Sequence, residues 1–439
     1  MHSPRKADPL LVGVLSLHNS AETKAICNAV TELGHTPVWI RREDFSWSVQ
    51  DGTIEIKPSV DVLCNRLLLT KSDRPLEEIE VLGLFERTVP TLNGAEAVSR
   101  AIHKVRAASV LADAGIPVPD AYFAISGTRL QDRLDTLDGR AVHKAGIGTN
   151  GQRMEAVESS DAIPARIQGW QSFLQSFIET DGERPSDIRV YVVDGEAIGA
   201  MRRTAAPDEW RSNVARGSSV EDVSDSLESA AYDLAIDATA ALGLDYAGVD
   251  LIRSADEWYV LEVNATAGFK GFRSATGINP AAAIARAAIE RAGGRVDTAA
   301  LAAVREEFDT SPPDTSYRQR TERDTETPTI GYTADVTVSG TDGRVDAVGK
   351  VDTGARRTSI DTKLAGEIGV GPIVGHATVR NGSGIRRRPL VEVSIGTDSS
   401  WHTVEANISD RSGMRYPVLL GRDILTDYRI DLTRRAGEE

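Results

Sequence analysis

Short apolar runs on either side of one amphipathic segment open the chain, and this order is typical of a βαβ unit. Ser20 is of a residue type that caps helices, an amphipathic stretch follows it to about Leu33, and Gly34 can end the helix. We therefore predict an α/β domain over residues 1–93. Its extended structure is expected in four apolar runs, 10–17 (LLVGVLSL), 36–40 (TPVWI), 60–69 (VDVLCNRLLL) and 88–93 (TVPTLN).

The pattern changes after this domain. An Ala-rich stretch predicts a single helix that ends near Gly115. Further along, an Asn150-Gly151 pair lies between two extended runs, which is a strong hairpin signal. We predict a second domain over residues 94–300. Its other expected elements are an extended edge segment at 116–123, a helix at about 225–242, strands at 246–252 and 258–264, and a helix at about 279–293.

A polar stretch rich in proline, threonine and aspartate separates this part from the rest of the chain. It has almost no apolar surface to bury, so we predict a linker over residues 301–328. Over residues 329–435, short β-branched runs alternate with glycine, asparagine and aspartate turns. This alternation is typical of a small all-β domain.

Composition narrows the protein class. A chain of 439 residues exceeds what one hydrophobic core usually organises, so two to four domains are expected. The net charge of −15 disfavours direct nucleic-acid binding. No apolar run approaches the roughly 20 residues that span a bilayer, and the first residues lack the layout of a secretory signal. We therefore expect no membrane partner and a cytoplasmic location.

Cys27 and Cys64 lie in apolar segments without metal-ligand spacing and are predicted to be buried free thiols.

Three oxygen-bearing side chains form the sharpest constellation. Glu262 and Asn264 are two residues apart in a strand pattern, so both point to one face. A hairpin centred on Asp256 would place Asp250 opposite Glu262. Oxygen ligands of this kind suit Mg²⁺ or Mn²⁺ held together with substrate phosphates, whereas a solvated polar face is the alternative.

Basic residues in small or apolar surroundings are the second signal. Lys104 and Lys144 are each a candidate for a phosphate contact or else a surface lysine. The glycines Gly146, Gly148 and Gly151 would let backbone N–H groups approach phosphate oxygens, although such a loop is often only a turn. An anionic substrate, or else a solvated loop, would explain the local cluster of Arg202, Arg203, Arg211 and Arg216 in an acidic chain.

These features occur in an order that closely resembles RimK-type ATP-grasp ligases, a family that adds α-linked amino acids, often glutamate, to a carboxylate. The resemblance covers roughly residues 5–295. It is carried by Lys104, by Lys144 with its glycine loop, and by the segments 172–179 (SFLQSFIE), 186–193 (SDIRVYVV), 201–203 (MRR), 210–218 (WRSNVARGS), 244–252 (LDYAGVDLI), 259–271 (YVLEVNATAGFKG) and 276–281 (TGINPA).

The resemblance implies an α/β domain and an α+β ATP-grasp domain that bind ATP and Mg²⁺. It implies that Asp250, Glu262 and Asn264 hold the metal, and that Arg211 and Asn213 act in catalysis. It also implies a set of nucleotide-binding residues: Lys104, Lys144, Gln175, Phe177, Ile178, Glu179, Asp187, Arg189, Arg211, Ser212 and Asn213.

The implied reaction transfers the γ-phosphoryl group to a substrate carboxylate, and an amine then displaces phosphate from the acyl phosphate. The expected partners are an amino acid, for which glutamate is the candidate, and a protein, peptide or small-molecule carboxylate acceptor. Relatives commonly carry His-Arg-Gly-Gly where this chain has residues 215–218 (ARGS), and this departure leaves the acceptor open.

The C-terminal all-β region carries its own motif. Asp352-Thr353-Gly354-Ala355 is followed by a hairpin-like segment with an Asn-Gly pair and then by 418–423 (VLLGRD). This order resembles a retropepsin-like domain of the small proteins called putative ATP-dependent zinc proteases, although no H-E-x-x-H motif supports zinc. The resemblance implies an aspartic-protease-like barrel. An aspartic mechanism needs two carboxylates, so Asp352 would come from each copy of a homodimer. Three arginines on the expected flap, Arg386, Arg387 and Arg388, would attract an acidic peptide.

Three functions remain open. The first is a glutamate ligase for a protein or peptide, fused to a domain that trims the same product or only docks a partner. The second is a ligase for a small molecule, such as a coenzyme glutamate tail or a carrier protein in lysine or arginine synthesis. The third is an ATP-binding module that regulates a partner without catalysis.

Overall fold

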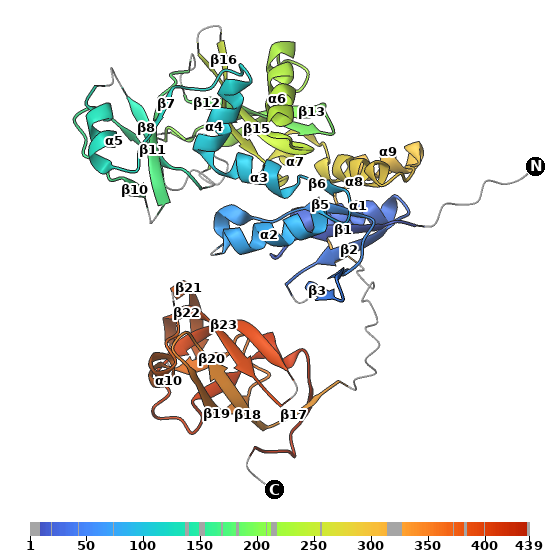
Figure 1. The fold of residues 1–439 in the computed structure, drawn as a ribbon, viewed down its shortest axis with the longest axis vertical. Helices are drawn as coiled ribbons and strands as arrows, with labels where there is room; N and C mark the ends of the chain where they lie inside the picture. The colour runs from blue at the N-terminus through green and yellow to red at the C-terminus, as the bar shows by residue number, and fades with distance from the viewer. Residues whose placement is uncertain are drawn as a thin grey trace, which may run out of the picture. The chain divides into compact units, whose positions relative to one another are not determined.

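The computed structural model describes most of the chain as two compact units, Met1–Gln319 and Arg320–Glu439 (Figure 1). The described residues are 9–18, 20–42, 44–72, 74–136, 140–148, 154–167, 170–180, 184–207, 209–211, 217–254, 257–313, 327–371, 373–381, 384–398 and 400–436.

The first unit begins with a parallel sheet in the order β2-β1-β5-β6, which confirms the predicted α/β beginning. Ser20 caps the first helix as expected, since its hydroxyl accepts the backbone N–H of Thr23 at 3.1 Å. The elements are β1 (Leu11–Leu15), α1 (Ala21–Glu32), β2 (Thr36–Ile40), β5 (Val62–Asn65), the 3₁₀ turn η1 (Leu69–Lys71), α2 (Pro75–Glu86) and β6 (Thr91–Leu92).

Helices cover both faces of this sheet, which is why its strands are continuous apolar runs. On one face Val14 and Cys64 pack with α1 and with α8 (Pro280–Arg291), and on the other face Leu15 and Leu63 pack with α2. Cys27 is buried in the same core as Cys64, and both thiols are free. Burial raises the pKa of each thiol to about 12.

A two-stranded hairpin, β3 (Ser46–Gln50) and β4 (Thr53–Lys57), was not predicted. Its turn carries a local signal, because Asp51 and Gly52 both have positive φ, at 50° and 78°. An Asp-Gly pair in this conformation is the preferred two-residue connection between antiparallel strands.

Two antiparallel sheets make up the rest of the first unit, in the orders β10-β11-β8-β9, with β7 on β11, and β14-β13-β12-β15-β16. The first contains β7 (Ala121–Phe123), β8 (Ala141–Ala145), β9 (Met154–Val157), β10 (Arg166–Ile167) and β11 (Trp170–Ser176). The second contains β12 (Ser186–Val193), β13 (Glu196–Thr204), β14 (Ser219–Asp222), β15 (Tyr246–Ser254) and β16 (Glu257–Asn264). The other helices are α3 (Ala95–Ile102), α4 (Lys104–Asp113), α5 (Gly127–Leu134), α6 (Ser229–Leu242), α7 (Lys270–Thr276) and α9 (Thr298–Glu306).

The prediction of a single Ala-rich helix up to about Gly115 is wrong, because the structure has two helices there, α3 and α4, separated at His103. His103 has extended dihedrals, φ −93° and ψ 103°, and its ring nitrogen accepts the N–H of Arg106. The break makes Lys104 the first residue of α4, where its backbone N–H donates to Gly146 O at 2.8 Å. Alanine propensity is too small a term to prevent a break that gains these hydrogen bonds.

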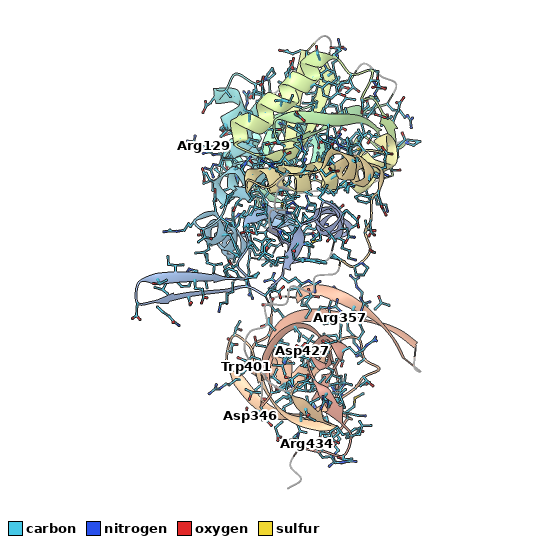
Figure 2. The ribbon with its side chains drawn as sticks, turned by 90° about the vertical axis from the view of Figure 1, so that its right-hand side faces the viewer. Arg129, Asp346, Arg357, Trp401, Asp427 and Arg434 are labelled. Carbon is cyan, nitrogen blue, oxygen red and sulfur yellow. The ribbon has the colours of Figure 1, made fainter. Side chains whose placement is uncertain are left out.

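The second unit is a small all-β domain, as predicted. Six of its strands close into a ring, because the order β18-β19-β24-β20-β23-β22 is completed by pairing of β22 with β18. The elements are β17 (Thr329–Gly331), β18 (Thr333–Ser339), β19 (Arg344–Val351), β20 (Ser359–Asp361), α10 (Thr362–Glu367), β21 (Ile373–Asn381), β22 (Gly384–Gly396), β23 (Trp401–Ser409), β24 (Val418–Leu420), α11 (Arg422–Leu425) and β25 (Arg429–Asp431). Trp401 and Arg357, labelled in Figure 2, both belong to this unit.

The boundary of the expected linker is displaced. Helix α9 continues to Glu306 and packs against α8, so the first residues of the 301–328 segment are helical. Leu301 of α9 and Phe308 just beyond it pack against the core that contains α8, so the start of the expected linker has apolar surface to bury. Across the described residues, no helix has the length and apolar character needed to cross a bilayer.

Candidate active site

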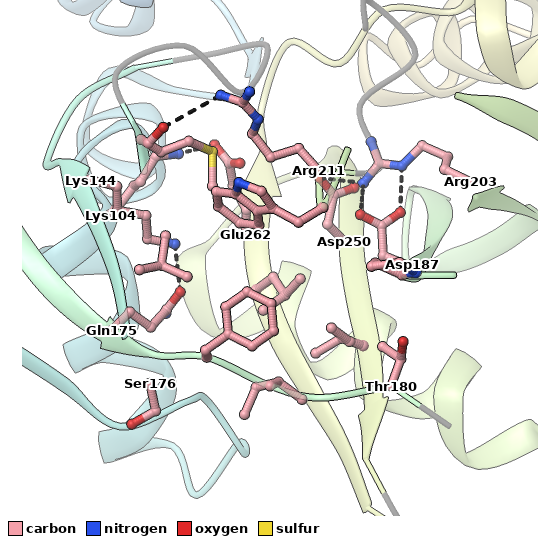
Figure 3. Close-up of a pocket in the computed structure, with 18 of the residues that line it drawn as sticks. Lys104, Lys144, Gln175, Ser176, Thr180, Asp187, Arg203, Arg211, Asp250 and Glu262 are labelled. Carbon is pink, nitrogen blue, oxygen red and sulfur yellow. Dashed lines mark hydrogen bonds and ion pairs between the residues drawn. The ribbon is translucent and has the colours of Figure 1, made fainter. Parts of the chain in front are cut away.

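A cavity lies between the two antiparallel sheets, and the side chains that line it come from both walls (Figure 3). The wall strands are β8 and β11 on one side and β12, β13, β15 and β16 on the other. The charged and amide side chains of the lining are Lys104, Lys144, Gln175, Asp187, Arg203, Arg211, Asp250 and Glu262.

Lys144, in β8, is a buried cation without a carboxylate within ion-pair distance among the described side chains. Its ammonium donates to Gln175 Oε1 at 2.5 Å and lies 5.3 Å from the centre of the Phe173 ring. Burial, together with the nearby ammonium of Lys104, lowers the pKa of Lys144 to about 7, although Glu262 raises it. A bound anion would favour the charged lysine, so this position suits a phosphate group.

Lys104 pairs with Glu262 across the cavity. The lysine is the first residue of α4 and the carboxylate lies in β16, so the pair joins a helix start to the second sheet. Both side chains line the same cavity. They therefore present one positive and one negative group to any ligand that enters.

Asp250, in β15, is held by two arginines. It accepts a bidentate pair of hydrogen bonds from Arg189 at 2.6 and 2.7 Å and lies 3.0 Å from Arg203 Nη2. Burial alone would raise the pKa of Asp250, but the two guanidinium groups outweigh burial and lower it to about 2. Arg203 also pairs with Asp187, at 2.5 and 2.7 Å. Asp250 and Asp187 thus hold Arg203 in a fixed position at the cavity wall.

The hairpin predicted for the strands that carry Asp250, Glu262 and Asn264 is confirmed by the pairing of β15 with β16. Asp250 lies directly opposite Glu262 in the β15–β16 register, and Asn264 Nδ2 lies 3.4 Å from Asp250 Oδ2. The three side chains thus supply two carboxylates and one amide at one edge of the cavity, a donor set that suits a hard cation such as Mg²⁺. In the described part of the chain, no group of three or more histidines, cysteines or acidic residues could hold a metal by itself.

The far end of the cavity is apolar. Phe177 and Ile178 follow β11 and line it, and the Phe177 ring lies 5.8 Å from that of Trp210. Glu179 is different, because its side chain is 76% exposed, lies 4.0 Å from Arg140 and is not part of the lining. These side chains offer an apolar and aromatic surface on which a flat ligand group could pack.

Arg211 lines the cavity and forms a bidentate pair with Glu209, with both distances 2.8 Å. The two neighbouring residues expected to act with it, Ser212 and Asn213, lie outside the described residues. Gly148 of the expected glycine loop lines the cavity, whereas Gly151 also lies outside the described residues. Arg202 points away and pairs with Glu221 at 3.4 Å, because alternate residues of β13 face opposite sides.

A second cavity, of about 460 Å³, adjoins the first, because Arg203 and Glu262 line both. Arg189 and Asn264 line this second cavity, so the trio lies where the two spaces meet. Arg66, which sequence reasoning missed, also lines it. The available signal was an arginine inside the mostly apolar run 60–69 (VDVLCNRLLL), because burying a charge is costly unless it has a partner.

In the second unit, Asp352 directly follows β19. Its backbone N–H donates to Leu420 O at 3.0 Å, and its Oδ1 accepts the N–H of Gly354 at 3.0 Å. The N–H and hydroxyl of Thr358 donate to Asp423. The two conspicuous motifs of this unit therefore lie together.

The expected flap is the long hairpin of β21 and β22, in which Asn381 pairs with Gly384. Its two turn residues, 382 and 383, and the side chain of Arg386 lie outside the description. Arg387 is exposed, whereas Arg388 donates to Asn407 Oδ1 at 3.1 Å. Only one of these two arginines is thus free of the barrel wall.

Comparison with known proteins gives consistent matches for the first unit. A family model described as a RimK-like ATP-grasp domain matches residues 101–288. The probable alpha-L-glutamate ligase 2 of Hahella chejuensis is 31% identical over 292 residues, which are 62% of this chain and 93% of that protein. The probable alpha-L-glutamate ligase of Shewanella pealeana is 33% identical over 216 residues, which are 48% of this chain and 46% of that protein, so the chain spans about half of that relative.

Solved structures show the same fold. D-cycloserine synthetase DcsG is 20% identical, with a TM-score of 0.51 over 64% of this chain and 99% of that chain. The ATP-grasp ligase PsnB, solved with a phosphomimetic variant of its minimal precursor, Mg and ADP, is 20% identical, with a TM-score of 0.50 over 64% of this chain and 98% of that chain. With the Hahella relative covered almost completely, the chain belongs to the RimK-like ATP-grasp family, together with proteins named as probable alpha-L-glutamate ligases.

Proposed function

We propose that the chain is an ATP-dependent carboxylate–amine ligase that joins glutamate to a carboxylate of a protein or peptide through an acyl phosphate. The observation that carries the proposal is the buried ammonium of Lys144 in a cavity that is also lined by the aromatic rings of Phe177 and Trp210. A nucleotide has both matching parts, a polyanionic end and a flat base. The family relationship and the Mg and ADP present in the PsnB structure support the same ligand.

In this proposal Phe177 and Ile178 contact the adenine, and Lys104, Lys144 and Gln175 lie at the phosphates. Asp187 would act by holding Arg203, and Arg189 by holding Asp250. Glu262, Asn264 and Asp250 would hold Mg²⁺, which would neutralise charge on the phosphate oxygens. Arg211 and Asn213 are proposed to contact the transferred phosphoryl group.

The chemistry needs positioning and charge rather than a protein nucleophile. A substrate carboxylate oxygen attacks the γ-phosphorus of ATP, the bond from that phosphorus to the β–γ bridging oxygen breaks, and ADP leaves. The amine then attacks the acyl carbon, phosphate leaves with the bonding electrons, and the nitrogen loses a proton. Arg203, held by two carboxylates at the boundary of the two cavities, is placed to stabilise negative charge at this step.

The test is release of ADP and phosphate by the purified full chain with ATP, Mg²⁺, glutamate and a panel of acceptors, with products identified by mass. Peptides that end in glutamate and small carboxylates form separate arms, since a small-molecule acceptor is the alternative substrate class. Glu262→Ala is expected to abolish ADP release, whereas Glu221→Ala, an exposed acidic residue on β14, is the matched control. ADP release at the rate of the blank with every acceptor would refute the proposal.

For the second unit we propose an aspartic-peptidase-like role in which two copies each supply Asp352 and remove the acidic tail that the first unit builds. The hydrogen bond of Asp352 to Leu420 of β24 and the presence of a long hairpin in the same unit support this proposal. Asp352→Asn should abolish tail removal and leave ligation unchanged, and a dimer should be seen by light scattering. Unchanged tail removal in this variant would favour a docking role instead.

A further inference from the structure

The second cavity opens at the carboxyl edge of the parallel sheet in the first unit. In the order β2-β1-β5-β6, the strand that follows β1 in the chain, β2, lies on one side of β1, and β5 lies on its other side. The crevice outside the ends of two such strands is the usual ligand position in an open α/β sheet. Residues just after β1 and β5, namely His18, Ser20 and Arg66, line this cavity.

Arg66 has an unusual environment. Its side chain is 4% exposed, and its Nε has no hydrogen-bond partner among the residues described. Its two terminal nitrogens lie 3.4 Å from one carbonyl oxygen, that of Ala267, and its guanidinium lies 5.0 Å from the centre of the Phe269 ring. A buried guanidinium normally has a carboxylate partner, because desolvation of an unpaired charge is costly.

The other two arginines of this cavity already have carboxylate partners, and its lysine, Lys71, is exposed. Arg189 pairs with Asp250, and Arg203 pairs with Asp187 and Asp250. Glu262 pairs with Lys104. Arg66 is therefore the buried cation of this cavity that stays available for an anion from a ligand, within the part of the chain that is described.

We propose that Arg66 is a specificity-determining residue that binds a non-reacting carboxylate of a substrate in the second cavity. This inference rests on the proposed ligase function and adds that one substrate must carry a carboxylate in addition to its reacting group. The carboxylate belongs either to the incoming amino acid or to the acceptor. Because Arg203 and Glu262 line both cavities, a substrate held by Arg66 has access to the site of phosphoryl transfer.

The experiment compares wild type, Arg66→Met, Arg66→Lys and the control Arg41→Met. Arg41 is an exposed arginine that follows β2 of the same sheet and stacks on Trp39 at 4.1 Å. Initial rates of ADP release are measured with saturating ATP, first with L-glutamate varied and then with the acceptor peptide varied. L-glutamine and L-isoglutamine, which block one carboxylate each, replace L-glutamate in two further arms.

Arg66→Met is expected to raise KM for one of the two substrates about ten- to a hundredfold, because a charge-assisted hydrogen bond is lost, while KM for ATP stays unchanged. Arg66→Lys should recover part of this loss. The substrate whose KM rises identifies the source of the carboxylate, and loss of discrimination against L-glutamine or L-isoglutamine identifies which group is bound.

Unchanged KM for both substrates in an Arg66→Met protein that still binds nucleotide would overturn the inference and leave the ligase function intact. Absence of ADP from wild type with every substrate pair would instead refute the ligase function. If Arg66→Met does not fold, calorimetric titration of Arg66→Gln, which keeps a polar side chain but no charge, with L-glutamate and with the acceptor peptide decides the question. Wild-type affinity for both ligands would overturn the inference.

Discussion

Replacement of Lys144 by methionine should remove most of the pH dependence of nucleotide binding. In the free protein, burial and Lys104 lower the pKa of Lys144 to about 7. A phosphate beside the ammonium would return this pKa toward the ordinary value of 10.5. The bound state would then hold a proton that the free state has lost above pH 7, so binding would take up a proton and weaken as pH rises.

The size of this effect follows from the two pKa values. For a site that must be protonated to bind, affinity falls by (1 + 10²)/(1 + 1), or about 50-fold, between pH 7 and pH 9, which corresponds to about 2.3 kcal/mol. At pH 8, about 90% of the free lysines would be neutral, so binding should take up about 0.9 proton per nucleotide.

The assay is isothermal titration with ADP and Mg²⁺ in buffers of different ionisation enthalpy, which reports affinity and proton uptake together. Lys144→Met should bind weakly and with little proton uptake at pH 8. Lys71→Met, which removes a lysine of η1 that lines the other cavity, is the control and should keep the wild-type slope. A wild-type affinity that is flat between pH 7 and pH 9, or an unchanged slope in Lys144→Met, would refute the reasoning.

Three further outcomes are expected. Asp250→Asn should leave Arg189 without its carboxylate, while Arg203 keeps Asp187, and should lower the free energy of unfolding by about 3–5 kcal/mol in a urea titration. A loss below about 1 kcal/mol would contradict the pairing. Asn93→Ala should destabilise the fold by a similar amount, because the Asn93 amide makes four hydrogen bonds to backbone atoms of residues 245, 246 and 265. Asn93 also has a positive φ of 59°, and an unchanged melting temperature would disprove this prediction. Phe177→Ala should weaken ADP binding about tenfold or more without affecting stability, and equal loss of inorganic triphosphate binding would exclude an adenine contact.

The parts of the fold that were predictable depend on local period and local turn chemistry. The cap at Ser20 and the opposition of Asp250 and Glu262 are both fixed by near neighbours in sequence or by the period of two in a hairpin. The structure agrees with both. The hairpin at Asp51-Gly52 had the same kind of signal and was recoverable in principle.

The remaining features depend on contacts between distant segments. The ion pair of Arg203 with Asp187 depends on a register shift between Tyr191 and Val192 of β12, because the Asp194-Gly195 turn alone would place Asp187 opposite Arg202. The break at His103 is stabilised by a bond from Lys104 to Gly146, which lies more than forty residues away. The charge of Arg66 becomes informative only when the structure shows that, among the described residues, its hydrogen-bond partner is a backbone carbonyl and no carboxylate forms an ion pair with it.

The boundary between the two cavities is where these charges matter together. Lys104 and Glu262 neutralise one another in the free protein, and both face the space that a nucleotide would occupy. If Glu262 turns to a metal, Lys104 is released to a phosphate, so one ion pair is exchanged for two without leaving a buried charge alone. Arg203 cannot exchange in this way, because its bidentate pair with Asp187 holds it even if Asp250 turns to the metal. We therefore expect the lysine side of the site to adapt to the nucleotide and the arginine side to stay fixed, which would keep the reacting carboxylate in register while ATP binds and ADP leaves.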